Sequence, residues 1–160
     1  MIRMIFAASS NGIIGRDGLL PWYLPDDLVR FRQLTAESVV VMGRRTWESL
    51  PTTVRPLVGR TNVVLTRSSG PIEGCITAHS VEQVLEYYPD SDVWFIGGTA
   101  VLQDAMTYVD EIYVTEVHID IRDGDAMAPS IDVQTFEIIS ESDILGAPGL
   151  QYRYIKYQRR

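Results

Sequence analysis

Asp27 is the residue of this 160-residue chain whose setting best fits catalysis. Pro25 suits the first turn of a helix that runs to about Leu34. On such a helix Asp27 shares its face with three apolar side chains, those of Leu24, Phe31 and Leu34. A carboxylate on a buried face must be paired, hydrogen-bonded or protonated, and we expect a ligand donor to be its partner. The plain alternative is an acid that the helix dipole favours in the first turn.

Arginine is concentrated between residues 44 and 67. This window holds five arginines and one acid, Glu48, and so carries a net charge of +4, whereas the other residues carry −11, for a total of −7. The five are Arg44, Arg45, Arg55, Arg60 and Arg67. A guanidinium makes planar two-pronged contacts with phosphate and carboxylate groups. The window therefore predicts a local anion site in an otherwise acidic protein.

Two glycine-containing junctions follow predicted strands. Met-Gly-Arg-Arg-Thr occupies residues 42–46, and Ile-Gly-Gly-Thr-Ala occupies residues 96–100. Glycine lets the backbone approach a ligand, and the helix that follows directs free N–H groups toward an anion. Glycine at a strand end is commonly only a turn residue, but both junctions together with the arginines favour a ligand with several phosphates. The fingerprint G-x-G-x-x-G is absent, so a standard dinucleotide fold is not indicated.

Alternating strand and helix patterns must position these residues. Strands are predicted at Ile2–Ala8, Ser38–Met42, Asn62–Leu65, Ile76–Ala78, Val93–Ile96, Glu111–His118, Phe136–Ser140 and Gln151–Gln158. Helices are predicted at Pro25–Leu34, Arg44–Leu50, Ser80–Tyr88 and Ala100–Met106, with Ser80 and Gln83 forming a capping box. The alternation predicts an α/β fold with a largely parallel sheet. The two closing strands lack an intervening helix and should be antiparallel. Ligands bind such sheets at the carboxyl ends of the strands.

Composition excludes several classes of protein. The charge of −7 argues against general binding to nucleic acid or to an anionic membrane. Cys75 is the single cysteine, and with only two histidines neither a disulfide framework nor a metal site is expected. No apolar run approaches the ~20 residues of a membrane span, and the amino terminus lacks the features of a signal peptide. We expect one cytoplasmic domain over residues 1–160.

Taken together, the motifs resemble dihydrofolate reductase along nearly the whole chain. The matching stretches begin with Gly-Ile-Ile-Gly at 12–15, Leu-Pro-Trp at 20–22, Leu-Pro-Asp-Asp-Leu at 24–28 and Val-Met-Gly-Arg-Arg-Thr-Trp-Glu-Ser-Leu at 41–50. They continue with Arg-Pro-Leu-Val-Gly-Arg at 55–60, Asn-Val-Val-Leu-Thr-Arg at 62–67, Ile-Gly-Gly at 96–98, Val-Thr-Glu at 114–116 and Gly-Asp-Ala at 124–126. The stretches Met-Gly-Arg-Arg-Thr-Trp and Gly-Asp-Ala-Met-Ala-Pro look most like actinobacterial members.

The resemblance implies a three-layer α/β fold. Its mostly parallel sheet has about eight strands with an antiparallel carboxyl-terminal strand, and about four helices flank it. The implied reaction is the NADPH-dependent reduction of 7,8-dihydrofolate to 5,6,7,8-tetrahydrofolate, which supports one-carbon metabolism and thymidylate synthesis. The implied protein is a cytoplasmic monomer and an antifolate target. The only implied cofactor is NADPH, with no metal.

The resemblance also assigns roles to individual residues. The implied catalytic group is Asp27, which binds the pterin edge, with Thr115 bridging toward the acid and Trp22 holding an ordered water. The implied substrate pocket is lined by Ile5, Phe6, Ala7, Leu28, Phe31, Leu50, Leu57 and Ile96, and Arg60 clamps the carboxylate of the glutamate tail. The implied NADPH site comprises Ala7, Ile14, Gly15, Leu20, Gly43, Arg44, Arg45, Thr46, Ser49, Leu65, Thr66, Arg67, Ile96, Gly97, Gly98, Thr99, Ala100, Val101 and Leu102. The loop from Ser9 to Leu24 matches a mobile lid.

Three residues depart from the family pattern. Thr99 replaces a glycine that often stands there, which tightens the pyrophosphate cradle and adds a hydroxyl donor. Leu102 replaces a tyrosine near the reacting rings, and loss of that polar contact should lower the rate. Val58 replaces a proline, which should loosen the loop that carries Arg60.

Two other functions remain open at this stage. A pyrimidine reductase of riboflavin synthesis shares the fold and cofactor, but should lack the Leu-Pro-Asp-Asp-Leu helix start and Arg60. A non-catalytic reductase-like protein is compatible with Leu102 and Thr99, whereas Trp22 and Asp27 argue against it. Oxidation of NADPH in the presence of dihydrofolate separates all three.

Overall fold

A computed structural model describes residues 1–16 and 20–160 of the chain. Its strands are β1 (Ile2–Ser9), β2 (Ile13–Gly15), β3 (Val39–Gly43), β4 (Thr61–Leu65), β5 (Ile76–Ala78), β6 (Val93–Gly97), β7 (Glu111–Val117), β8 (Ala126–Met127), β9 (Phe136–Glu141), β10 (Leu145–Ala147) and β11 (Leu150–Arg159). Its helices are α1 (Pro25–Thr35), α2 (Arg44–Ser49), α3 (Val81–Tyr87) and α4 (Thr99–Ala105). The expected Asp17-Gly18 turn of the lid lies outside the described residues.

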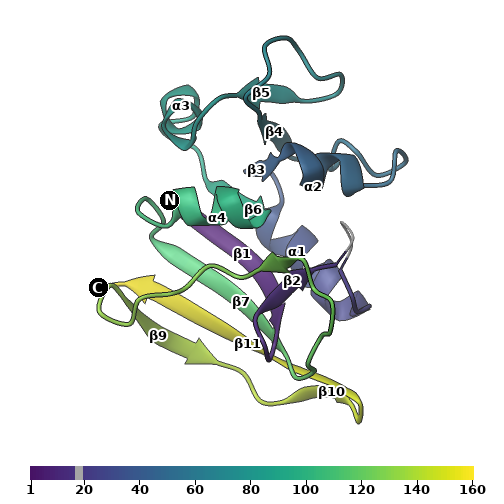
Figure 1. The fold of residues 1–160 in the computed structure, drawn as a ribbon. Coiled ribbons are helices and arrows are strands. Elements are labelled where there is room, and N and C mark those ends of the chain that lie inside the picture. The colour runs from purple at the N-terminus through teal and green to yellow at the C-terminus, as the bar shows by residue number, and fades with distance from the viewer. Residues whose placement is uncertain (17–19) are drawn as a thin grey trace.

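The main sheet has the strand order β10-β11-β7-β1-β6-β3-β4-β5, and β9 pairs with β11 beside β10 (Figure 1). From β7 to β5 all neighbours are parallel, so their carboxyl ends lie at one edge of the sheet. β11 runs antiparallel to β7, β9 and β10. The fold class and the antiparallel closing strands are therefore confirmed.

Helices cover both faces of the sheet. On one face, Trp47 of α2 and Phe31 of α1 pack against Ile5, Val40 and other strand residues. On the opposite face, α3 and α4 contribute Val84 and Leu102 to a larger cluster. Strand residues alternate between the two clusters because successive side chains of a strand point to opposite faces. The result is the three-layer arrangement that the resemblance implies.

The structure contains three short strands that were not predicted, β2, β8 and β10, and the start of α3 differs in detail. The Ser9–Leu24 loop contains strand β2, which pairs with β8 more than a hundred residues later, a partner that local periodicity cannot reveal. At the start of α3, the Ser80 hydroxyl accepts a hydrogen bond from the Gln83 N–H as predicted. The Gln83 side chain, however, accepts from the N–H of His79 rather than of Ser80, so the capping box is incomplete.

Candidate active site

Strand register places the polar residues of β7 and β11 beneath α1. Ala7 of β1 lies beside Thr115 of β7, and Thr115 lies opposite Tyr154 of β11. Ile5 and Tyr113 are paired two positions earlier, on the same face. Alternation along the strands thus directs these side chains toward the helix that carries Asp27.

Asp27 is half-buried and accepts a hydrogen bond of 2.7 Å from the Thr115 hydroxyl to its Oδ1 atom. Burial raises the pKa of Asp27, whereas the Thr115 hydrogen bond and the positive charge of Arg30 lower it, and burial dominates. The Thr115 contact is the one that the resemblance implies, and a ligand donor as a further partner of this acid stays a prediction. Arg30 lies one helical turn further along α1, a spacing visible in the sequence.

The predicted substrate-pocket residues have four different settings. Ile5, Phe31, Leu50, Leu57 and Ile96 pack in one cluster beneath α1 and α2, and Ala7 and Trp22 pack in the adjoining cluster around Leu24. Leu28 is exposed on the outer part of α1. Phe6 is a correction, because strand alternation turns its side chain to the opposite face, into the cluster with Met4 and Ala8. Only the Phe6 backbone can border the site.

Trp22 lies near the carboxyl end of the lid segment and packs in the same cluster as Ala7 and Tyr154. Its Nε1 atom is buried and has no hydrogen-bond partner among the described residues. A buried indole N–H requires an acceptor. This donor fits the ordered water that the resemblance assigns to Trp22.

Arg60 is tied to the end of α1. Its Nη1 donates to Thr35 Oγ1 at 3.2 Å, and its Cζ lies 5.8 Å from the centroid of the Phe31 ring. Burial and the like charge of Arg32 lower the pKa of Arg60. Such an electrostatic setting favours an anion beside Arg60, in agreement with the predicted carboxylate clamp.

Asn62 organises the loop that presents Arg60, although the sequence did not single it out as a site residue. The buried side chain accepts from Leu57 N at 2.8 Å and donates to Leu57 O at 3.0 Å and Arg60 O at 3.1 Å. These contacts hold the loop despite the exposed Val58, which stands where proline is common. A buried amide at the start of a strand was the available signal, because such a group must find partners nearby.

The two glycine junctions meet at the carboxyl ends of β3 and β6. Met42 pairs with Gly97, and a Cβ on Gly43 would lie 3.8 Å from Gly98 N. A Cβ on either Gly97 or Gly98 would lie 3.7 Å from Thr46 Oγ1. Gly97 also has φ of +137°, a conformation that L side chains rarely adopt. The backbone and the Thr46 hydroxyl therefore line one small cradle, which fits a pyrophosphate group.

Basic residues lie next to this cradle. Arg44 pairs with Glu48 at 3.0 Å, and its Nη1 contacts Ser68 Oγ at 3.4 Å, which joins the start of α2 to the loop after β4. Arg45 and Arg67 are exposed in the same two segments. Leu65 ends β4, and the buried Thr66 that follows accepts from Ser68 N at 3.1 Å. The two segments that carry the predicted phosphate-binding groups are thus in contact through Arg44 and Ser68.

The remaining predicted cofactor residues have different settings. Ser49 donates its hydroxyl to Thr46 O at 2.6 Å within α2. Thr99 donates to Met127 O at 2.7 Å, so the extra donor expected for the cradle is instead used to join α4 to β8. Leu102 is fully buried in the core, Val101 is buried beside it, and Ala100 is exposed. The side chains of Val101 and Leu102 therefore support the cradle from behind.

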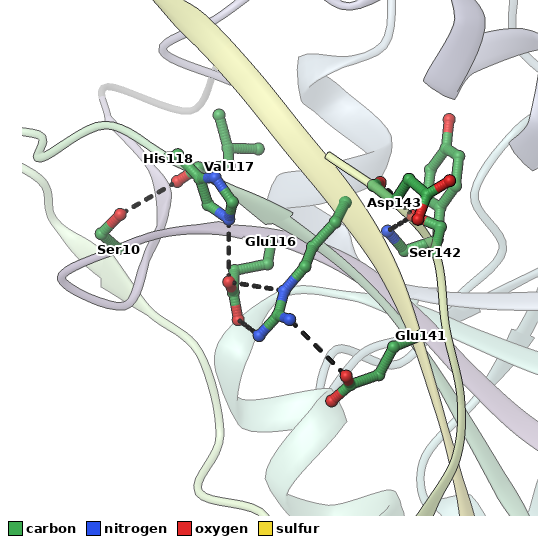
Figure 2. A network of polar contacts seen from close by, with 9 residues as sticks. Ser10, Glu116, Val117, His118, Glu141, Ser142 and Asp143 are labelled. Atoms are coloured by element: carbon green, nitrogen blue, oxygen red, sulfur yellow. Dashed lines mark hydrogen bonds and ion pairs between the residues drawn. The ribbon is translucent and has the colours of Figure 1, made fainter. Parts of the chain in front are cut away.

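The lid segment is tied down at its base. Gly15 O accepts from Asp125 N at 3.1 Å beside the β2–β8 pair, and Ile14 is half-buried whereas Leu20 is exposed. Ser10 donates to Val117 O at 3.4 Å, as Figure 2 shows. Mobility of the lid stays a prediction.

A second polar network occupies the opposite face of β7. Glu116 Oε1 accepts from Arg153 Nε at 3.0 Å and lies 2.9 Å from His118 Nε2 (Figure 2). Arg153 also pairs with Glu141 of β9 at 3.7 Å. The network pins β7, β9 and β11 together and leaves Thr115, one residue earlier, on the Asp27 face.

Within residues 1–16 and 20–160, no group of three or more His, Cys, Asp or Glu side chains is placed to hold a metal ion. In the same described part of the chain, no helix is long and apolar enough to cross a membrane.

Comparison with known proteins identifies the family. The family model for dihydrofolate reductase matches residues 1–159. The chain belongs to the dihydrofolate reductase family. Two dihydrofolate reductases, from Mycobacterium leprae and Mycobacterium tuberculosis, are 40% and 41% identical to it, and each match covers 99% of this chain and 98% of the relative. A solved dihydrofolate reductase from Enterococcus faecalis, complexed with NADP(H) and RAB-propyl, superimposes with a TM-score of 0.90 at 32% identity, covering 100% of this chain and 96% of the other.

Proposed function

We propose that this member of the dihydrofolate reductase family reduces 7,8-dihydrofolate to 5,6,7,8-tetrahydrofolate with NADPH. The observation that best supports this reaction is the half-buried Asp27 carboxylate, which is hydrogen-bonded to Thr115 above a face formed by Ile5 and Ala7. A partly buried acid with a raised pKa is characteristic of a functional site. Among the described residues, Asp27 is the acid of α1 whose side chain lies on the face toward the sheet.

We assign Asp27 to the pterin edge of the substrate. Thr115 occupies Oδ1, so Oδ2 is the atom assigned to the substrate amino group. The negative charge makes the bound pterin more basic, which eases protonation of the ring nitrogen next to the reduced carbon. Trp22 Nε1 holds the water near this edge, and solvent supplies the proton. Asp27 thus acts through charge and hydrogen bonding rather than through a covalent bond.

The rest of the substrate extends along the cluster beneath α1. Phe31, Leu50 and Leu57 are assigned to the aminobenzoate ring, because all three are partly buried apolar side chains of one cluster and apolar side chains suit such a ring. Arg60 is assigned to the α-carboxylate of the glutamate tail, in a two-pronged contact.

NADPH, when bound, supplies the hydride for the reduction. The Gly97-Gly98 backbone and Thr46 are assigned to its pyrophosphate, because among the described residues the Thr46 hydroxyl is the one group within 4 Å of where a Cβ on either glycine would lie. Arg44, Arg45 and Arg67 are assigned to its 2′-phosphate. Such a phosphate distinguishes NADPH from NADH and attracts concentrated positive charge.

The deciding experiment follows the loss of reduced-nicotinamide absorbance with dihydrofolate present. We expect oxidation that depends on both dihydrofolate and protein, and that is much slower in the Asp27→Asn variant. Oxidation with a pyrimidine substrate of riboflavin synthesis but not with dihydrofolate would assign the chain to that reaction. Absence of turnover despite NADPH binding would indicate a non-catalytic protein.

We further propose that residues 1–160 form one domain that acts as a cytoplasmic monomer without nucleic acid. The net charge of −7 supports the lack of affinity for nucleic acid. The monomeric state is supported by the resemblance alone, and sedimentation of the protein tests it.

A further inference from the structure

Arg30 has an unusual setting for a cation in this site. Its Cζ lies 3.9 Å from the centroid of the Tyr154 ring and 5.7 Å from that of Tyr113. The Nη1 atom is buried and has no hydrogen-bond partner among the described residues. A guanidinium stacked on an aromatic face and shielded from water retains a strong electrostatic effect on its neighbours.

The nearest acid along the helix is Asp27, one turn before Arg30. The charge of Arg30 lowers the pKa of Asp27 and thus opposes the effect of burial. Both side chains also act on Tyr154. Burial and the charge of Asp27 raise the pKa of that phenol, Arg30 lowers it, and the result is about 12. Tyr154 therefore stays neutral near neutral pH and acts as a platform rather than as a competing charge.

The other groups on this face leave Arg30 as the cation that matters for Asp27. On β7 the neighbours are Thr115, which donates a hydrogen bond, and the phenol of Tyr113; on β11 they are the phenols of Tyr152 and Tyr154. Lys156 lies further along β11 and is paired with Glu111 at 2.8 Å. On α1 itself, Asp26 is exposed. Within the described residues Arg30 takes part in no ion pair, so its charge is not neutralised by another acid.

We propose that Arg30 is a positioning residue for the reaction: stacked on Tyr154, its unpaired guanidinium favours the charged form of Asp27 and so opposes the effect of burial on this face of the sheet. The inference rests on the proposed function for its catalytic meaning. Its electrostatic content concerns the free protein and can be tested without substrate. The consequence is that the site keeps its working charge to a lower pH than burial alone would permit.

A purely structural role for Arg30 makes a different prediction. The aliphatic stem and the planar head could serve only to cover Tyr154, as long side chains commonly do. Methionine retains most of that apolar cover without charge, whereas lysine retains charge without the planar stack. Comparing Arg30→Met with Arg30→Lys therefore separates charge from packing.

The experiment is a carbon-13 NMR titration of the Asp27 carboxyl group in the protein without ligands. The Asp27→Asn variant identifies the resonance. Arg160→Met is the matched control, because it removes one arginine charge just beyond the carboxyl end of β11, about 20 Å along the chain from Tyr154. If Arg30→Met does not fold, Arg30→Gln takes its place, with similar length and no charge.

We expect the Asp27 pKa to rise in Arg30→Met, to rise less in Arg30→Lys and to be unchanged in Arg160→Met. In the pH profile of kcat/KM, the acidic limb of Arg30→Met should move to higher pH. Its activity at the wild-type midpoint should fall about twofold or more. An Asp27 pKa that is the same in Arg30→Met as in Arg160→Met would overturn the proposal, as would equal rises in the Met and Lys variants. If the titration shifts but dihydrofolate is not turned over, the proposed function fails and the electrostatic coupling stands.

Discussion

Thr115 Oγ1 donates a hydrogen bond of 2.7 Å to Asp27 Oδ1, joining β7 to the first turn of α1 across 88 positions of the chain. The contact depends on parallel pairing of β7 with β1, which places Thr115 beside Ala7 on the face below the helix. Thr115 is almost fully buried, so its hydroxyl needs an acceptor and Asp27 supplies one. The acid is thereby fixed by the sheet rather than by its own helix.

Asp27→Asn should reduce hydride transfer from NADPH to dihydrofolate at neutral pH by a hundredfold or more, on the order of one lost electrostatic contact in an active site. The amide keeps the shape but removes the charge that makes the pterin basic. Lowering the pH should restore part of the activity, because solvent then protonates the substrate directly. Single-turnover rates over a range of pH measure this, with NADPH binding as the control that should not change. Near wild-type turnover at pH 7 would return Asp27 to the plain role of a helix-dipole acid.

The raised pKa of Asp27 also predicts a pH-dependent cost in stability. A carboxyl group with a higher pKa in the folded than in the unfolded protein is harder to ionise when folded. Stability is therefore lost as the pH rises from the ordinary aspartate pKa of about 4 through the folded value. Urea unfolding should show that Asp27→Asn gains stability relative to wild type between about pH 4 and pH 7. A constant difference over that range would mean that the pKa is not raised.

Local sequence patterns were sufficient to predict most elements, and they singled out Asp27, whose catalytic role stays a proposal. The apolar runs of β1, β3 and β6 and the face of α1 are local properties, and each was predicted within one or two residues of its observed bounds. β2 could not be predicted, because its pairing with β8 depends on a contact between remote segments. Phe6 was misplaced because the resemblance concerned a backbone segment, whereas alternation along the strand decides where its side chain points.

Contacts made through space explain what else was missed. The Thr99 hydroxyl was expected to face a ligand, but Met127 O lies within hydrogen-bond distance after folding. The alternating residues around Tyr154 do not mark it as a residue of the site. Its place below Arg30 follows from the register of β11 on β7. The spacing of three positions between Asp27 and Arg30 can be read from the sequence, but the burial of Arg30 Nη1 cannot.

Arg60→Lys should weaken the binding of dihydrofolate, with little effect on a pterin that lacks the glutamate tail. The change keeps the charge but loses the planar fork that matches a carboxylate. KM for dihydrofolate should rise about tenfold or more while kcat is nearly retained, which corresponds to roughly 1–2 kcal/mol of charge-assisted hydrogen bonding. Steady-state kinetics with both substrates measure this. An equal loss with the tail-less pterin would assign Arg60 a structural role through its contact with Thr35.

Asn62→Leu should reproduce the substrate effect of Arg60→Lys without touching the substrate. The substitution leaves the N–H and C=O of Leu57 without their side-chain partner, which should cost about 2–4 kcal/mol of stability. A loosened loop should raise KM for dihydrofolate more than it lowers kcat. The comparison with Asn62→Asp is informative, because the carboxylate can still accept from Leu57 N but cannot donate to Leu57 O or Arg60 O. Unchanged KM in both variants would show that the loop holds Arg60 in place without the Asn62 side chain.

Arg67→Ala should raise KM for NADPH much more than KM for NADH. Arg67 is exposed in the loop after β4, which Arg44 reaches through its contact with Ser68, so the change removes charge without opening the core. The 2′-phosphate is the group that distinguishes the two cofactors, and one exposed phosphate contact is worth about 1–2 kcal/mol, or roughly five- to thirtyfold in affinity.

Arg122→Ala, which removes an exposed arginine charge from the loop before β8, is the matched control and should leave the ratio of the two KM values unchanged. Because the interaction is electrostatic and exposed, the preference of the wild type for NADPH should also weaken as salt rises, and that of Arg67→Ala should weaken less. Equal effects of Arg67→Ala on NADPH and NADH would place the 2′-phosphate elsewhere on the protein.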